Sequence, residues 1–389
     1  MTTVLERTRW GAVFAVSSGI VLAALDLTAV AVALPVLGTD LGAGPTVTQW
    51  VLLAYNIPLI ALSIPAGRWL DRAGHLPAFL LAVGGFGATS LLIAVAPTTG
   101  VVLVGRALQG AFSALIGAVT MPIIAGNVRP EHRARAMGIV LTLIPLSGVA
   151  GPAFGGLLTD LFGWRSVFLI NLPVVAVAVL AGRRGIAADG RGLPWPGRRI
   201  LVESVVFGAR VVRRRSLALP LASLPLMLTG VGALNFVVPY LLVDLPSRTV
   251  GLVLLAMSVG MAVLSPIAGV VADRHGYRVV ASTGAAVILI GTVLLLRAGD
   301  DPWDLAWRLA VIGIGHGLFA GPNAAALLAR TPPELMGTAG GMTTLVRTVG
   351  FSVGPVLGAS LGGFHPTVAV LVAITALGVV ATVAQQRTG

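Results

Sequence analysis

A single acidic residue, Asp26, lies deep inside an apolar stretch that covers residues 11–37. A carboxylate within hydrocarbon costs roughly 2.5–3.5 kcal/mol on insertion scales, so Asp26 is expected to face a cavity or a partner. Burial disfavours the charged form of a carboxyl group, which suits a group that takes up a proton in one state and releases it in another. The alternative is a packing role, with Asp26 hydrogen-bonded to Thr28 or to a neighbouring helix.

Arg106 is the second candidate for the mechanism, inside the apolar stretch of residues 100–126. A guanidinium there needs acceptors, and it could control the protonation of a nearby carboxylate or bind an anionic group of a substrate. Gln109 lies three residues later on the same helical face, as expected for a stripe that lines a cavity. The alternative is that Arg106 extends its side chain to the membrane interface.

Other polar and aromatic residues in the apolar stretches are candidates for a substrate cavity. His316 could titrate, although a lone histidine between Gly315 and Gly317 is more often a packed hydrogen-bonding residue. The full predicted cavity set is Asp26, Tyr55, Gln109, Asn235, Phe236, Tyr240, His316, Phe319 and Asn323.

The elements that position these residues are membrane-spanning helices. The chain has 389 residues, is 56% hydrophobic and only 10% charged, and has a mean hydropathy of +0.96. A soluble domain cannot bury that much apolar surface. Stretches long enough to cross a bilayer predict twelve helices, at about 11–37, 46–66, 77–95, 100–126, 134–159, 166–182, 216–243, 249–272, 279–297, 303–329, 336–361 and 366–385.

The net charge of +12 comes from arginines whose positions agree with the predicted topology. With both termini in the cytoplasm, most arginines fall on the cytoplasmic side, and only Arg165, Arg248 and Arg297 lie outside the cell. This positive-inside bias explains the basic loops, through orientation and attraction to anionic lipid, better than nucleic-acid binding does. The chain has no cysteine, no lysine for a phosphate-binding loop and no histidines at metal-ligand spacing, so neither an enzyme nor a metal site is predicted.

The chain also contains an internal repeat. Gly151-Pro152 returns as Gly354-Pro355, and Arg106 returns as Arg308. An even number of spans separates the copies, so they predict two parallel bundles as in a two-halved carrier. The predicted organisation is a six-helix bundle at 1–182, a basic cytoplasmic linker at 183–215 and a second six-helix bundle at 216–389.

Three motifs resemble those of the major facilitator superfamily, and within it the drug:proton antiporters. The loop signature matches at Gly67, Asp71, Arg72 and Gly74, and the helix-four signature at Arg106, Gln109 and Gly110. The helix-five antiporter signature matches at Gly138, Gly151, Pro152, Gly155 and Gly156. The first helix around Asp26, together with Gln49-Trp50 and Trp164-Arg165…Asn171, is similar to the fourteen-helix drug-efflux branch, although only twelve spans are present here.

The resemblance implies a cytoplasmic gate in which Asp71 contacts the amino end of helix eleven in the outward-facing state. A helix amino end attracts a carboxylate, which agrees with this role. Arg133 and Arg135 could add charge partners for Asp71, and Asp273 and Arg274 form the second copy of the loop pair. The alternative is a charged turn that only sets topology.

The expected function is proton-coupled efflux of amphipathic drugs or natural products, cationic ones included, by alternating access. The proton gradient would supply the energy with no cofactor. The partners would be substrate, protons and lipid but no nucleic acid, and the chain would work as a monomer in the bacterial inner membrane. Two alternatives stay open: a uniporter or importer of a small metabolite, and a membrane enzyme or sensor that reuses the fold.

Overall fold

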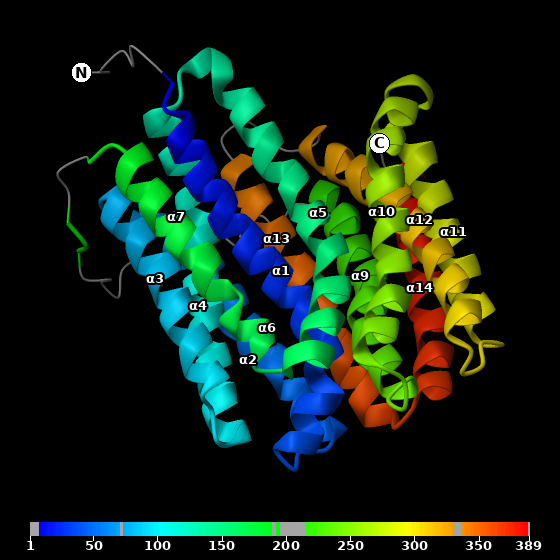
Figure 1. The fold of residues 1–389 in the computed structure, drawn as a ribbon. Helices are drawn as coiled ribbons and strands as arrows, with labels where there is room; N and C mark the ends of the chain where they lie inside the picture. The colour runs from blue at the N-terminus through cyan, green and yellow to red at the C-terminus, as the bar shows by residue number, and fades with distance from the viewer. Residues whose placement is uncertain (1–7, 71–72, 189–191, 195–214, 330–335, 388–389) are drawn as a thin grey trace.

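The computed structural model describes residues 8–70, 73–188, 192–194, 215–329 and 336–387. Long helices make up nearly all of this part of the chain (Figure 1). Their bounds are α1 Trp10–Asp40, α2 Pro45–Leu70, α3 His75–Ala94, α4 Thr99–Asn127, α5 Pro130–Phe162, α6 Ser166–Leu169, α7 Asn171–Gly185, α9 Arg215–Leu241, α10 Ser247–His275, α11 Tyr277–Leu295, α12 Pro302–Ala329, α13 Met336–Leu361 and α14 Phe364–Arg387.

These helices confirm the all-helical membrane fold. Each predicted span falls on one of them, and the short α6 continues into α7 as a single crossing at Ser166–Gly185. Within the described residues, nine stretches are long and apolar enough to cross a membrane. The chain is therefore a polytopic membrane protein. Its helices, with α6 and α7 counted as one, form two sets of six, α1 to α7 and α9 to α14.

The two sets form two bundles with the same internal packing. In the first bundle α1 packs extensively on α5, α2 on α4 and α3 on α4, and the equivalent pairs in the second bundle are α9 with α13, α10 with α12 and α11 with α12. A Cβ added to Gly110 would meet the Tyr55 carbonyl oxygen, and one added to Gly313 would meet the Met257 carbonyl oxygen. The repeat seen in the sequence thus extends to backbone contacts between equivalent helices.

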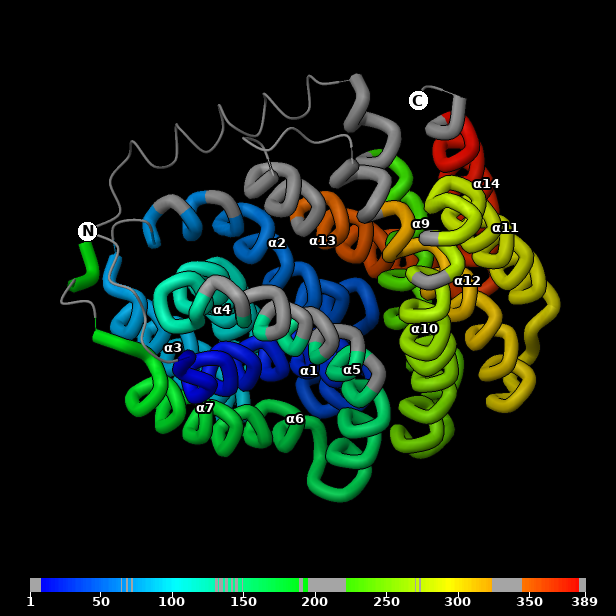
Figure 2. The backbone as a smooth tube through the Cα atoms, turned by 90° about the horizontal axis from the view of Figure 1, so that it is seen from above, coloured from blue at the N-terminus to red at the C-terminus, as the bar shows by residue number. Residues whose placement is uncertain are grey.

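The bundles meet along two pairs of helices (Figure 2). Helix α10 packs against α5, and α13 packs against α2. Glycines of the helix-five signature permit the close approach: a Cβ on Gly155 would lie 2.4 Å from the Ala29 carbonyl oxygen in α1, and one on Gly156 would lie 2.3 Å from the Ser247 carbonyl oxygen in α10. Helix α5 therefore packs against its own bundle at Gly155 and against the other bundle at Gly156.

The contacts between bundles gather at the end of the molecule that contains the loop after α5. There Asp160 accepts hydrogen bonds from the backbone N–H groups of Ser247 at 2.7 Å and Arg248 at 2.8 Å, at the start of α10. Thr48 of α2 is hydrogen-bonded to Tyr240 of α9 at the same end. Helices α5 and α10 diverge toward the opposite end (Figure 1), so the bundles are closed at the end away from the basic linker.

The described part of the linker contacts the loop between α2 and α3. The backbone N–H of Gly74 donates to the Gly192 carbonyl at 2.9 Å, and the Trp69 indole N–H donates to the Pro194 carbonyl at 2.7 Å. Helix α7 ends at Gly185 and α9 begins at Arg215, and the cytoplasmic linker at 183–215 stays a prediction.

Candidate functional site

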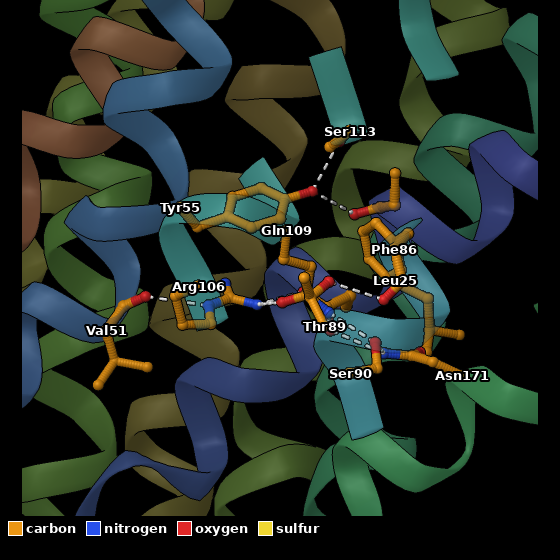
Figure 3. A network of polar contacts seen from close by, with 12 residues as sticks. Leu25, Val51, Tyr55, Phe86, Thr89, Ser90, Arg106, Gln109, Ser113 and Asn171 are labelled. Atoms are coloured by element: carbon orange, nitrogen blue, oxygen red, sulfur yellow. Dashed lines mark hydrogen bonds and ion pairs between the residues drawn. The ribbon is translucent and has the colours of Figure 1, made fainter. Parts of the chain in front are cut away.

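A buried ion pair joins α1 and α4 within the first bundle. Figure 3 shows its arginine, Arg106, with Gln109, Ser90 and Asn171 nearby. Nη1 of Arg106 in α4 is 2.5 Å from Oδ2 of Asp26 in α1, and both side chains have no exposed surface. Helix α1 carries the carboxylate at about its midpoint, and α4 carries the guanidinium about two turns from its start. The two charges compensate each other, because a single buried charge without a partner would be strongly unfavourable in this apolar environment.

The second carboxylate oxygen of Asp26 is also hydrogen-bonded. Its Oδ1 accepts from Nδ2 of Asn171 in α7 at 3.0 Å and from Nε2 of Gln109 in α4 at 3.4 Å. Both amides donate in addition to Oγ of Ser90 in α3, at 3.2 Å for Asn171 and 2.8 Å for Gln109. The carboxylate is therefore held by side chains from two other helices.

Arg106 also joins α4 to α2. Its Nε donates to the Val51 carbonyl at 3.0 Å, and Nη1 donates to Oε1 of Gln109 at 2.7 Å. The guanidinium carbon lies 4.3 Å from the centre of the Tyr55 ring, a cation–π geometry, and the Tyr55 hydroxyl donates to Ser113 Oγ at 2.8 Å. Nη2 is buried without a hydrogen-bond partner in the part of the chain that the structure describes.

This network bears on the alternatives for Asp26 and Arg106. Thr28 donates to the carbonyls of Ala24 and Leu25, and the partners of Asp26 are instead side chains of the neighbouring helices α4 and α7. Arg106 is fully buried, so it does not extend to the membrane interface. Five helices meet at the pair, and a role of Asp26 in proton binding stays a prediction.

The remaining predicted cavity residues are enclosed. Tyr55 belongs to the Arg106 network, whereas the other predicted residues belong to α9 and α12 of the second bundle. Phe236 packs on Tyr240 with ring centres 5.1 Å apart, Asn323 accepts from Ser223, and the Nδ2 of Asn235 donates to the Val231 carbonyl. Each of these except the half-buried Tyr240 is buried, as are His316 and Phe319. Their contact with substrate stays a prediction, and this conformation does not expose them.

The predicted gate is only partly within the described residues. Asp71 and Arg72 lie outside them, as do the side chains of Arg133, Arg135 and Asp273. Gly67 lies in the last turn of α2, Gly74 precedes α3, and Arg274 is exposed in the last turn of α10. In the helix-five signature, Gly138 and Gly151 lie on α5 with Pro152, Gly155 and Gly156, and a Cβ on Gly151 would overlap Thr28 of α1.

Sequence reasoning did not assign Ser90, Ser113 or Asn171 to the site. Ser90 and Ser113 are small polar residues that occur in many membrane helices for packing reasons, so nothing in their types points to Asp26. Asn171 had a weak signal, because it is a fully polar amide at the start of an apolar helix and stands in the Trp164-Arg165…Asn171 motif.

Two sequence matches decide the family. The sequence model of the Major Facilitator Superfamily matches residues 16–241 and 221–385. The chain belongs to this superfamily. The superfamily consists of secondary transporters rather than enzymes, so the membrane-enzyme alternative is set aside.

Three curated relatives cover most of the chain. The "Probable actinorhodin transporter" of Streptomyces coelicolor is 30% identical, across 89% of this chain and 71% of that protein. The "Riboflavin transporter RibZ" of Clostridioides difficile is 22% identical across 89% and 86%. The "Methylenomycin A resistance protein" of S. coelicolor is 28% identical across 87% and 83%. These names support membrane transport and drug efflux for the group to which the chain is similar.

A solved structure shares the fold. It is a bacterial homologue of the human lysosomal transporter Spinster, in an inward-facing and unoccupied conformation, with a TM-score of 0.74 and 18% identity over 98% of this chain and 94% of that one. At this identity the match concerns the fold, and it agrees with the two-bundle architecture.

Proposed function

We propose that the protein exports small amphipathic molecules, drugs or natural products, across the bacterial plasma membrane in exchange for protons. The observation that carries the proposal is the fully buried Asp26–Arg106 pair with its amide donors. Relatives named for antibiotic transport and resistance support the substrate class. The glycine packing of α5 against both α1 and α10 supports antiport, because it matches the antiporter signature.

In the proposed cycle, the described conformation faces the cytoplasm and has Asp26 deprotonated. The arginine-rich linker then lies in the cytoplasm, and the closed end of the bundles lies outside, as the positive-inside bias favours. Protonation of Asp26 leaves Arg106 as a buried charge without its partner, a state that costs about 3–5 kcal/mol in comparable buried pairs. That cost favours a rearrangement of α1 against α4, and substrate binding would favour the other state.

The pair also constrains the substrate. Asp26 has no exposed surface and already has a cationic partner, so a cationic substrate would have to displace Arg106 to reach it. A neutral or weakly charged amphipathic molecule meets no such competition. Neutral aromatic natural products are therefore the first substrates to test, with dye cations beside them.

The test is substrate-induced proton movement in everted vesicles that contain the wild type or Asp26→Asn. The control is Asp300→Asn, which removes an exposed carboxylate far from the pair. We expect proton release on substrate addition in the wild type and in Asp300→Asn, and none in Asp26→Asn. Equal exchange in all three would show that the proton site lies elsewhere. Substrate movement without any proton movement would favour the metabolite uniporter or importer, which the similarity to a riboflavin transporter also suggests.

A further inference from the structure

A cavity on the first bundle combines apolar walls with unpaired arginines. It lies between the start of α1 and the end of α7, has a volume of about 490 Å³ and is lined by Arg9, Gly11, Phe14, Ala181, Arg184 and Gly185. Arg9 and Arg184 are both exposed. Neither guanidinium has an ion pair or side-chain hydrogen bond within the described ranges, so both charges are free to bind an anion.

Two glycines form the floor of this cavity. A Cβ on Gly185 would lie 2.3 Å from the backbone carbon of Gly11, so α1 and α7 touch here without intervening side chains. Figure 2 shows the start of α1 beside the end of α7. The close contact leaves a recess between the side chains that flank it, with Arg9 directly before α1 on one side and Arg184 in the last turn of α7 on the other.

The wall of the cavity continues into the lipid-facing surface. Phe14 is 57% exposed on α1, and Val177 and Leu180 are 46% and 54% exposed on α7. Arg184 lies four residues after Leu180, on the same face of the helix, so the apolar stripe ends in a positive charge. Trp10, 40% exposed in the first turn of α1, is a residue type typical of the membrane–water interface.

We propose that this cavity binds the headgroup of an anionic phospholipid, with phosphate between Arg9 and Arg184 and acyl chains along Phe14, Val177 and Leu180. Basic recesses between transmembrane helices at the cytoplasmic surface suit such headgroups. The uncapped amino end of α1 adds donors and a favourable dipole beside the phosphate. A soluble anion would use the arginines but not the apolar stripe, whereas a phospholipid uses both.

The experiment is lipid titration of the purified full-length protein in detergent, followed by native mass spectrometry. Phosphatidylglycerol and phosphatidylcholine with the same acyl chains are the probes. The test variant is Arg9→Gln/Arg184→Gln, and the matched control is Arg183→Gln, an exposed arginine one residue away that does not line the cavity. We expect the double variant to bind phosphatidylglycerol at least roughly tenfold more weakly than the wild type does, and the control variant to bind it as the wild type does.

Three results would overturn the proposal. Equal loss in Arg183→Gln would show that general surface charge attracts the lipid. Equal binding of phosphatidylcholine by the wild type would show that the cavity does not select an anionic headgroup. Competition of inorganic phosphate with phosphatidylglycerol at equal concentration would make the ligand a free anion. A separate control checks folding: the double variant should bind phosphatidylcholine as the wild type does.

Discussion

Asp26 accepts hydrogen bonds from three side chains, two on α4 and one on α7, while its own helix supplies none of them. A movement of α7 or α4 would therefore break hydrogen bonds to this carboxylate. In the proposed cycle, these bonds link the protonation of Asp26 to the positions of α4 and α7.

Asn171→Ala tests this link. The variant removes one donor to the Asp26 carboxylate, so the proposed proton-linked transport should slow. Loss of a buried hydrogen bond worth about 1.5 kcal/mol would correspond to a fall in rate of roughly tenfold. The measurement is the initial rate of proton-linked transport in vesicles over a range of pH.

Two comparison variants separate this effect from simple damage. Asn171→Gln keeps an amide donor and should restore part of the rate, whereas Ser90→Ala touches only the amides that bind Asp26 and should lower the rate less. A rate in Asn171→Gln no higher than in Asn171→Ala would mean that Asn171 only supports packing.

Residue type explains which site residues could be found from the sequence. Asp26, Arg106 and Gln109 stood out because charged and amide groups are costly in apolar stretches. Their mutual contact was not readable, because spacing along the chain does not say which faces of α1 and α4 meet. Ser90 was not recognisable at all, since a serine can satisfy its hydroxyl within its own helix.

At the scale of elements, helix α5 has two glycine contacts with different consequences. Gly155 lies against Ala29 in the same bundle, whereas Gly156 lies against Ser247 in the other bundle. In the proposed cycle, the first contact stays within one bundle and the second opens when the closed end opens. The sequence identified these glycines only as part of the helix-five signature, and the partner of each glycine required the structure.

Gly156→Val should therefore shift the molecule toward the state in which this end is open. A Cβ would meet the Ser247 carbonyl oxygen at 2.3 Å, and overpacking of this kind costs about 1–3 kcal/mol in the closed state alone. The chain has no native cysteine, so spin labels can be placed on Phe162→Cys and Val243→Cys. The distribution of distances between the two labels should then gain a longer component.

The matched control is Gly148→Val on the same helix, where an added Cβ would have no atom within 4 Å. It should leave the distance distribution unchanged. If both variants lengthened the distance equally, the effect would come from altered helix propensity rather than from the contact between α5 and α10.

For the whole molecule, hydropathy and the repeat were sufficient to predict two bundles of six helices, because bilayer thickness fixes the length of each crossing. They could not predict which end is closed. That depends on a few groups: Asp160 at the start of α10, and Thr48 with Tyr240. A carboxylate at a helix amino end contributes about 0.3–1 kcal/mol at exposed sites, so the closure is weak enough to reverse during a cycle.

Transport by alternating access requires this end to open, which a covalent link would prevent. Leu161→Cys on α5 and Arg248→Cys on α10 flank the Asp160 contact, and a short bis-maleimide between them should abolish transport. A link between Asp40→Cys and Arg165→Cys, whose side chains pair at 2.6 Å within the first bundle, should leave transport intact. Retained transport across the α5–α10 link would mean that the bundles do not separate at this end, and the substrate path would then have to lie within one bundle. Loss of transport with both links would point to general rigidity, whereas loss with the first alone ties the transport step to the separation of α5 from α10.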